Sequence, residues 1–284
     1  MFYIVAVFGL IIGSFLNVVI NRLYTKEDII KKRSHCPECG AILKWYELIP
    51  VVSFIIQRGK CRKCNEKISW QYPFVEIATA LIFLQVFNYQ LSIINQLSTF
   101  NYQFLIGLAF LFVVAGGLII IFVYDLKHFI IPDIVLAPLV LLTSLAILFD
   151  VWTFGNWEPF GNWKLITENS TLLSSLTSAL LVGLLASLPF FVLNMVSGGR
   201  AMGFGDVKLA FFLGLFLDFQ TVGLAIFLAF ILGGIVGGGL IIFKKKKLKS
   251  RVPFGPFLVL GTYIALFWGH ELVDWYLDKL AVLS

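Results

Sequence analysis

The sequence predicts an all-α polytopic membrane protein with about eight transmembrane helices and a small four-cysteine module between the first two of them. Of its 284 residues, 59% are hydrophobic and only 13% are charged, whereas a soluble domain of this size carries roughly 25% charged residues. Apolar runs long enough to cross about 30 Å of hydrocarbon recur along the chain. All four cysteines lie in one polar stretch, between residues 36 and 64.

Each predicted span is an apolar run bounded by polar or turn-forming residues. The sixth run is short, so it either continues past Asp218 or crosses locally thin bilayer, because a span usually needs about 20 residues. The predicted domains are a first transmembrane helix over 1–20, a cysteine module over 21–73 and a transmembrane domain over 74–284. The eight expected spans are residues 2–20, 74–95, 103–124, 133–150, 173–195, 206–217, 221–243 and 254–274.

The distribution of basic residues predicts the orientation of these spans. With the amino terminus outside, 20 of the 22 lysines and arginines fall on the cytoplasmic side, and only Lys164 and Lys279 do not. The net charge of +6 therefore reflects membrane orientation and gives no support to nucleic-acid binding. The first 20 residues lack a basic start and a small-residue cleavage site, so they are expected to remain as a span.

Two further stretches border the predicted spans. Residues 151–171 are expected to form an external loop whose indoles, Trp152, Trp157 and Trp163, rest at the membrane interface. The basic run Lys244–Lys247 is expected either to anchor the preceding span or to attract anionic lipid of the bilayer.

The cysteines form two C-x-x-C pairs, Cys36 with Cys39 and Cys61 with Cys64, separated by 21 residues. Four thiolates at such spacing predict a tetrahedral Zn²⁺ site, and four protein ligands leave no open position, so the metal is expected to be structural. A reducing cytoplasm argues against disulfides. Two alternatives remain open here, which are a redox pair and replacement of one ligand by His35.

Two carboxylates are expected at the same edge of the membrane. Asp125 ends the third span and Asp206 begins the sixth, and charges at membrane depth are costly enough to suggest a function. Packed together, they would share a proton and polarise one water, as in aspartic proteases. Helix-end charges further assign Asp206 as the base and Asp125 as the acid. The alternatives are a helix-capping Asp206 and a solvated, interfacial Asp125.

Residues beside these carboxylates are expected to shape the same region. Gly203 and Gly205 allow the backbone to bend and an extended peptide to approach closely. Asp133 is expected to cap the fourth span, and Asp218 is expected to lie in a turn on the external side.

A series of short motifs runs in order along the chain, and this series resembles the bacterial prepilin peptidases, the type IV leader peptidases of pilus, type II secretion and competence systems. In that family a G-x-G-D segment such as Gly203–Asp206 is one member of the ordered set. The matching segments are Gly13–Ile20, Arg33–Cys39, Trp45–Pro50, Arg58–Cys64, Tyr72–Glu76, Asp125–Asp133, Met202–Lys208 and Pro253–Phe257.

The resemblance implies an intramembrane aspartyl protease of the bacterial inner membrane, with Asp125 and Asp206 as its catalytic pair and 74–284 as its peptidase domain. Its substrates would be prepilins or pseudopilins, cut after a glycine at the cytoplasmic face. Relatives with the four-cysteine loop also methylate the new amino terminus with S-adenosylmethionine. The chain departs from many relatives at Lys127, where they carry an acid, and in the length of its external loop.

Other classes of function remain in view from the sequence. A secondary transporter also uses intramembrane carboxylates but places them near the midplane, and a non-enzymatic scaffold would use the zinc loop to dock a partner. No glycine-rich nucleotide loop occurs in 21–73, so the methyl-donor site is not derivable from the residues. The glycines between 233 and 239 allow close helix packing, either within the chain or against a substrate helix.

Overall fold

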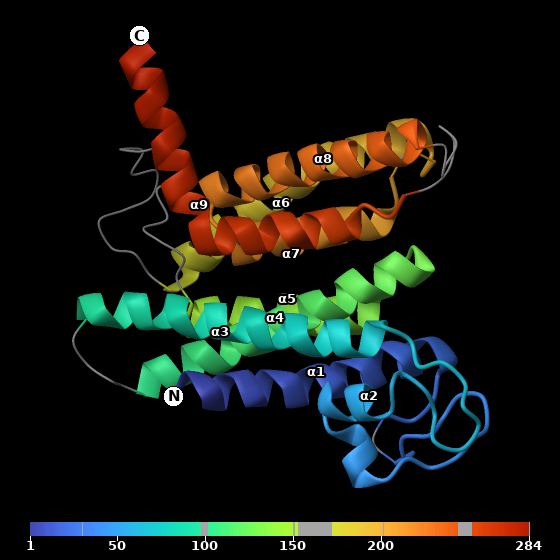
Figure 1. Cartoon of the computed structure of the whole chain (residues 1–284). Helices are drawn as coiled ribbons and strands as arrows, with labels where there is room; N and C mark the ends of the chain where they lie inside the picture. Colours follow the sequence, from blue (N-terminus) through green and yellow to red (C-terminus); the bar gives the residue numbers. More distant parts are fainter. Residues whose placement is uncertain are drawn as a thin grey trace. The chain divides into compact units, whose positions relative to one another are not determined.

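The computed structural model of the chain is almost entirely helical, as the sequence predicts (Figure 1). It describes residues 1–29, 31–97, 102–149, 151–152, 172–200, 202–243 and 252–283. Across these ranges the only β-type pairing is a pair of isolated bridges in the cysteine module. The chain packs as two compact units, Met1–Ile120 and Ile121–Ser284.

A helix occupies each of the eight predicted spans. Six of the described helices are long and apolar enough to cross a membrane, while α5 is shorter and α7 has only 13 residues; the count of eight spans therefore stays a prediction. The helices are α1 (Phe2–Thr25), α3 (Gln71–Leu97), α4 (Tyr102–His128), α5 (Asp133–Leu148), α6 (Leu172–Ser197), α7 (Phe204–Phe216), α8 (Phe219–Ile242) and α9 (Gly255–Leu283).

In the first unit, α1 and α3 approach each other closely along small residues (Figure 1). A Cβ added at Gly9 would lie 2.6 Å from Ala80 Cα, and one added at Gly13 would lie 2.7 Å from Glu76 Cα. Without strong hydrophobic attraction between helices in lipid, such close backbone contact is what holds a helix pair together. A side chain at either glycine would force the pair apart.

The cysteine module, which includes the short helices η1 (Trp45–Leu48) and α2 (Val52–Ile56), is tethered to this helix pair by hydrogen bonds. Near the start of α3, the Asn17 amide donates to the Tyr72 carbonyl oxygen at 3.1 Å. Arg22 donates to two carbonyl oxygens of the turn at 28–29, each at 2.9 Å. The carboxylate of Glu76 accepts the Val51 N–H at 2.7 Å. These bonds fix both ends of the module against α1 and α3.

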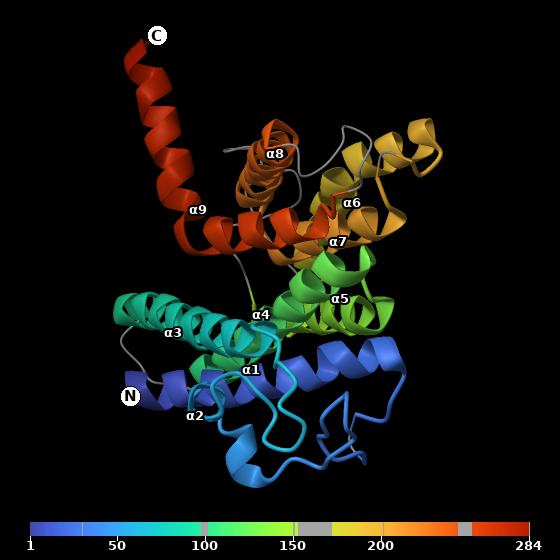
Figure 2. The same ribbon diagram turned by 45° about the vertical axis from the view of Figure 1, so that its right-hand side comes forward.

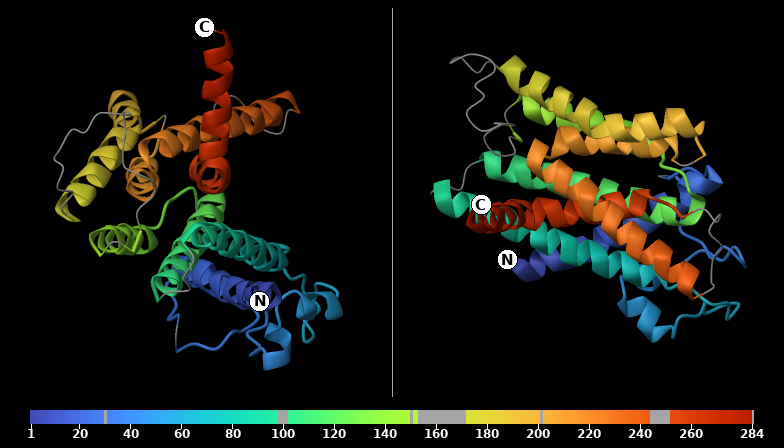
Figure 3. Two further views of the ribbon diagram at one scale, coloured as in Figure 1. Left: turned by 90° about the vertical axis from the view of Figure 1, so that its left-hand side faces the viewer. Right: turned by 90° about the horizontal axis from the view of Figure 1, so that it is seen from above.

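In the second unit, α6 packs on α7 and α8 packs on α9 (Figure 3). The first contact is close because a Cβ at Gly214 would lie 2.7 Å from Gly183 Cα. The second is equally close, since a Cβ at Gly261 would overlap the carbonyl oxygen of Ala225. Figure 2 shows that α9 changes direction part-way along its length.

The break between α7 and α8 confirms the predicted turn at Asp218. Helix α7 ends at Phe216 and α8 begins at Phe219, so the short sixth helix does not continue past Asp218. The Asp218 Oδ1 accepts both the N–H and the hydroxyl of Thr221, each at 2.6 Å. This is the capping geometry expected of an aspartate before the first turn of a helix.

The position expected for Trp152 is wrong. Its side chain is only 6% exposed, its ring stacks on that of Phe216 with centroids 5.3 Å apart, and its Nε1–H donates to the Phe216 carbonyl oxygen at 3.0 Å. It therefore satisfies a free carbonyl at the end of α7 and does not rest at an interface. Trp157 and Trp163, like the basic run Lys244–Lys247, lie outside the described residues.

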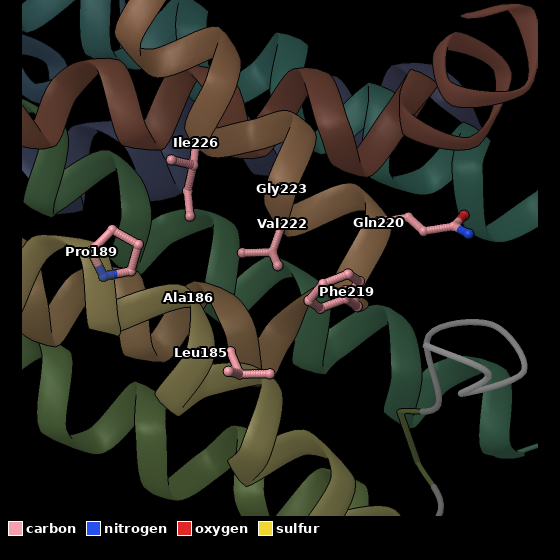
Figure 4. Close-up of a pocket in the computed structure, with 8 residues that line it drawn as sticks. All are labelled: Leu185, Ala186, Pro189, Phe219, Gln220, Val222, Gly223 and Ile226. Carbon is pink, nitrogen blue, oxygen red and sulfur yellow. The ribbon is translucent and has the colours of Figure 1, made fainter. Parts of the chain in front are cut away.

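A groove of about 330 Å³ opens between α6 and α8 (Figure 4). Most of its lining is apolar, and Gln220 points away from the other labelled side chains. A site for chemistry usually adds a few convergent polar groups to apolar walls, so this groove suits hydrocarbon rather than a reacting group. Its lining residues are Leu185, Ala186, Pro189, Phe219, Gln220, Val222, Gly223 and Ile226.

Candidate active site and metal centre

Asp125 lies in the last turn of α4, and its side chain is only 4% exposed. The helix ends just beyond it, where Phe129 adopts a φ of 57° and donates its N–H to the Asp125 carbonyl oxygen. Gly255 packs against the carboxylate, because a Cβ added there would lie 2.6 Å from Oδ2, and Oδ2 is buried and has no hydrogen-bond partner within the described ranges. The alternative of a solvated, interfacial Asp125 is therefore wrong, and a buried carboxylate oxygen left unpaired is costly enough to suggest a ligand or a proton.

Asp206 is the third residue of α7 and is partly buried. Its Oδ2 accepts the Gly203 N–H at 3.2 Å, and its own N–H donates to the Gly203 carbonyl oxygen at 3.2 Å. This reciprocal pair corresponds to a capping box. Asp206 thus does cap α7, as the alternative expected. The cap engages only Oδ2, so Oδ1 stays available to bind a water molecule or a proton.

The two carboxylates share a neighbourhood in the second unit and lie close enough for their charges to interact. Ile131, which is buried, connects their surroundings. A Cβ at Gly205 would lie 3.2 Å from Ile131 Cβ, and a Cβ at Gly255 would lie 3.4 Å from Ile131 Cδ1 and 2.6 Å from Asp125 Oδ2. The starts of α7 and α9 therefore meet around Ile131, and this packing brings together two aspartates that are far apart in the sequence.

These contacts refine two expectations about the surroundings of the pair. The space beside Gly205 is filled by Ile131, whereas a Cβ at Gly203 would meet only Asp206 Oδ2 at 3.5 Å and the N of Gly205 at 3.9 Å. Close approach by a peptide thus stays a prediction for Gly203 but has less room at Gly205. Because Asp125 lies at the start of α9 as well as the end of α4, helix-end charges no longer separate an acid from a base.

The four cysteines converge in the cysteine module of the first unit. The two cysteine pairs lie on two turns of similar backbone conformation. In each turn the N–H of the first cysteine donates across the turn, from Cys36 to the Ala41 carbonyl oxygen and from Cys61 to the Glu66 carbonyl oxygen. The residue after each pair adopts positive φ, 66° at Gly40 and 59° at Asn65. Asn tolerates this conformation better than most residues, so Asn65 takes the role of Gly40 in the second turn.

The sulfur positions fit one tetrahedral metal ion. All four Sγ atoms lie within 4.8 Å of one another, and Cys36 Sγ is 3.9 Å from Cys64 Sγ. Zn–S bonds of about 2.3 Å in a tetrahedron separate the sulfurs by about 3.8 Å.

His35 does not belong to this cluster. Its Nδ1 lies 3.3 Å from the Arg33 carbonyl oxygen, and the metal-type group consists of the four cysteines. All four are free thiols without disulfides. The donor set therefore fits structural zinc, in which the metal would be held by Cys36, Cys39, Cys61 and Cys64 and would supply no reacting position.

Comparison with known proteins matches both halves of the chain to one peptidase family. Residues 7–89 match the bacterial peptidase A24 N-terminal domain, and residues 112–238 match the type IV leader peptidase family. The chain belongs to the type IV leader peptidase family. The N-terminal match contains the four cysteines, and the second contains Asp125 and Asp206.

Relatives of this leader peptidase family match almost end to end, and each is named prepilin leader peptidase/N-methyltransferase. A protein of Aeromonas salmonicida is 29% identical, covering 98% of this chain and 94% of its own. One of Pseudomonas aeruginosa is 28% identical, covering 95% and 91%. One of Bacillus subtilis is 28% identical, covering 98% of each. No solved structure matches the chain.

The role expected for Asp133 in this family member is wrong. The N-cap of α5 is Pro132, without a side-chain cap, and Asp133 instead pairs with Lys208, whose Nζ lies 2.8 Å from both carboxylate oxygens. The pair joins the start of α5 to the first turns of α7, two residues after Asp206.

Charge reversal tests whether this pair fixes the start of α7. Because both side chains are partly exposed, Asp133→Asn or Lys208→Met should cost at most about 1 kcal/mol of stability. We expect Asp133→Lys alone to slow peptide cleavage more than Asp133→Asn, and Asp133→Lys with Lys208→Asp to recover most of that loss. Initial cleavage rates of the singles and the swap give the answer. A swap no faster than Asp133→Lys would show that pairing is irrelevant.

Asn194 is a contributor that the sequence interpretation missed. Its side-chain amide donates to the Met202 carbonyl oxygen at 2.7 Å, and its main-chain carbonyl oxygen accepts the Gly199 N–H at 2.9 Å. It therefore ties the end of α6 to the segment leading into Gly203. The available signal was a lone amide side chain near the end of an apolar span, where polar groups are costly without a partner.

Proposed function

We propose that this leader peptidase removes the short basic leader of type IV prepilins or pseudopilins, with Asp125 and Asp206 as its catalytic pair. The observation that carries the proposal is the buried Asp125 carboxylate, whose Oδ2 lacks a partner within the described ranges while Asp206 lies within electrostatic reach. A packing role explains neither the burial nor the proximity of two acids. Membership of the leader peptidase family supports the same activity.

In this proposal one carboxylate is ionised and the other carries a proton. The ionised carboxylate takes a proton from a water molecule while the water oxygen attacks the scissile carbonyl carbon. The protonated carboxyl group donates its proton to the carbonyl oxygen. The resulting gem-diol then collapses: the C–N bond breaks, the carboxyl that took the proton of water gives it to the leaving amine, and one gem-diol hydroxyl returns its proton to the other carboxylate. Like charges at short range disfavour double ionisation, so the pair titrates as a unit.

Sidedness is part of the proposal. The bias of lysines and arginines supports a chain with its amino terminus outside, so that Asp125, Asp206 and the cysteine module face the cytoplasm of the inner membrane. A substrate with a basic leader before a hydrophobic helix would then present its scissile bond at that face. In α8, Gly234, Gly237, Gly238 and Gly239 have no neighbouring atom within 4 Å of an added Cβ, which leaves this side open to a substrate helix.

Three acidic side chains of the module have partners within it. Glu27 pairs with Lys32 at 2.7 Å, and this hydrogen bond lowers the pKa of Glu27. Glu47 accepts the Lys44 N–H at 2.8 Å, and the Asp28 side chain accepts the Lys31 N–H at 3.0 Å. These local partners engage the three carboxylates that lie near the predicted cytoplasmic side.

Methyl transfer to the new amino terminus is the second activity, and it matches the names of the relatives. We propose S-adenosylmethionine as the methyl donor. Zinc bound by the four cysteines would hold the module in one fold, because a loop of this size lacks a large core.

The test uses the purified full chain in lipid nanodiscs with a prepilin that carries its basic leader. Intact-mass analysis should find one cut after the glycine that precedes the hydrophobic helix. With S-adenosylmethionine present, the mature product should gain the mass of a single methyl group. Solute uptake by proteoliposomes without cleavage would instead favour a transporter, and neither activity would leave a scaffold.

A further inference from the structure

The start of α9 meets Asp125 at one residue, Gly255. In the first turn of a helix the N–H groups lack an intrahelical acceptor. The Phe257 and Leu258 N–H groups both bond to the Phe254 oxygen, and Pro256 has no N–H. Gly255 is the residue of this turn that lies against the Asp125 carboxylate.

The side-chain space of Gly255 is occupied by Asp125. A Cβ there would lie 2.6 Å from Asp125 Oδ2 and 3.3 Å from its Cγ, well inside van der Waals contact, which begins at about 3.5 Å between heavy atoms. The carboxylate thus rests directly against the Cα of Gly255. No residue other than glycine accommodates that contact without moving the carboxylate or the helix.

Helix α9 has little freedom to move away. Phe254, just before Gly255, packs against Phe190 and Phe230 with ring centroids 6.0 and 5.0 Å apart. Further along, Gly261 lies against the Ala225 carbonyl of α8. Because these contacts fix the start of α9, a methyl group at Gly255 would displace the Asp125 side chain instead of the backbone.

We propose that Gly255 is a positioning residue for Asp125, because the space that its missing side chain leaves sets where the carboxylate stands. This inference rests on the proposed function, since it assigns Asp125 to the reaction. The Pro253–Phe257 segment would thereby contribute to the peptidase step by positioning Asp125. The unpartnered Oδ2 is the oxygen whose location depends on that space.

The test is Gly255→Ala in the full chain, with Gly223→Ala as the matched control because no atom lies within 4 Å of an added Cβ at Gly223. We expect Gly255→Ala to lower kcat for leader removal by about 100-fold, the cost of an ångström-scale misplacement, with little change in KM. Methyl transfer to an already processed pilin should keep its wild-type rate, as should cleavage by the control. Cleavage by Gly255→Ala at the wild-type kcat would overturn the proposal.

A second variant separates Asp125 from the other neighbour of Gly255. Ile131 Cδ1 lies 3.4 Å from the added Cβ, and Ile131→Val removes that atom. Gly255→Ala with Ile131→Val should remain as slow as Gly255→Ala alone, because the overlap with Asp125 Oδ2 persists. Recovery of kcat in the double variant would assign the defect to packing on Ile131 and would refute a positioning role.

A stability cycle keeps the proposal testable if Gly255→Ala folds poorly. The added methyl group should lower the melting temperature in the wild-type background and should not lower it in an Asp125→Ala background, where the overlapping carboxylate is gone. Equal losses in both backgrounds would contradict the proposal. If wild-type protein itself cut no prepilin in these assays, the proposed function would fail, whereas the cycle would still judge the Gly255 contact.

Discussion

Asp125→Asn and Asp206→Asn should each abolish measurable leader removal, with a loss of about 10⁴-fold in kcat. An amide of the same size neither accepts the proton of water nor supplies an acidic proton, and general acid–base groups contribute roughly 10²–10⁴-fold each. Because the two groups act as a unit, the double variant should be no slower than either single one. Initial rates on one prepilin, compared at equal amounts of folded protein, measure this.

The chain offers matched controls for that experiment. Asp218→Asn changes an aspartate at the far end of α7, where its Oδ1 caps α8 through Thr221. Asp133→Asn changes one paired with Lys208. Both variants should keep cleavage within about tenfold of wild type, since Asp218 loses a cap and its contact with His270 Nε2 at 3.5 Å, and Asp133 loses an exposed ion pair. Wild-type activity in either variant of the proposed pair would remove the dyad from the account.

Removal of one thiolate should collapse the cysteine module. Cys36→Ser or Cys61→Ser leaves three sulfur ligands, and structural zinc in small domains contributes apparent binding energies of about 10–16 kcal/mol that are also folding energy. We expect purified wild type to contain one zinc ion per chain and either variant to lose it. Elemental analysis, together with protease cleavage between residues 31 and 70, measures both effects.

His35→Ala is the control for the zinc experiment, because His35 lies outside the sulfur cluster. Its zinc content and protease resistance should equal those of wild type. Conversely, a Cys36→Ser protein that retained both properties would show that the module folds without metal. Loss of zinc from His35→Ala would instead show that His35 takes the place of one cysteine ligand.

Hydrophobic patterning predicted the helices of this chain well, because span length and composition are local properties of the sequence. The break at Asp218 was predictable for the same reason, since a carboxylate interrupts an apolar run and caps the next helix. Several helices continue past the ends of the predicted spans. Helix α4 continues to His128 and α9 to Leu283, because polar residues extend a helix beyond the hydrocarbon at no cost.

The chemistry-bearing residues were predicted as types, but their partners were not. Spacing alone indicated four zinc-binding thiolates, and it did not reveal that Asn65 adopts the conformation of Gly40. The links from Asp133 to Lys208 and from Gly255 to Asp125 join residues 75 and 130 positions apart. Such pairs depend on how helices pack, and no local pattern records which side chain meets which backbone.

The contact between Asp125 and Asp206 is the central claim, and thiol cross-linking tests it directly. A reacting pair that shares one water lies within about 6 Å, two hydrogen-bond lengths, whereas Asp218 is about 18 Å from Asp206 along α7 at 1.5 Å per residue. In membranes, a short bifunctional thiol reagent should join the cysteines of Asp125→Cys/Asp206→Cys, identified by peptide mass. It should not join those of Asp125→Cys/Asp218→Cys. Cross-linking of the second pair but not the first would contradict the account.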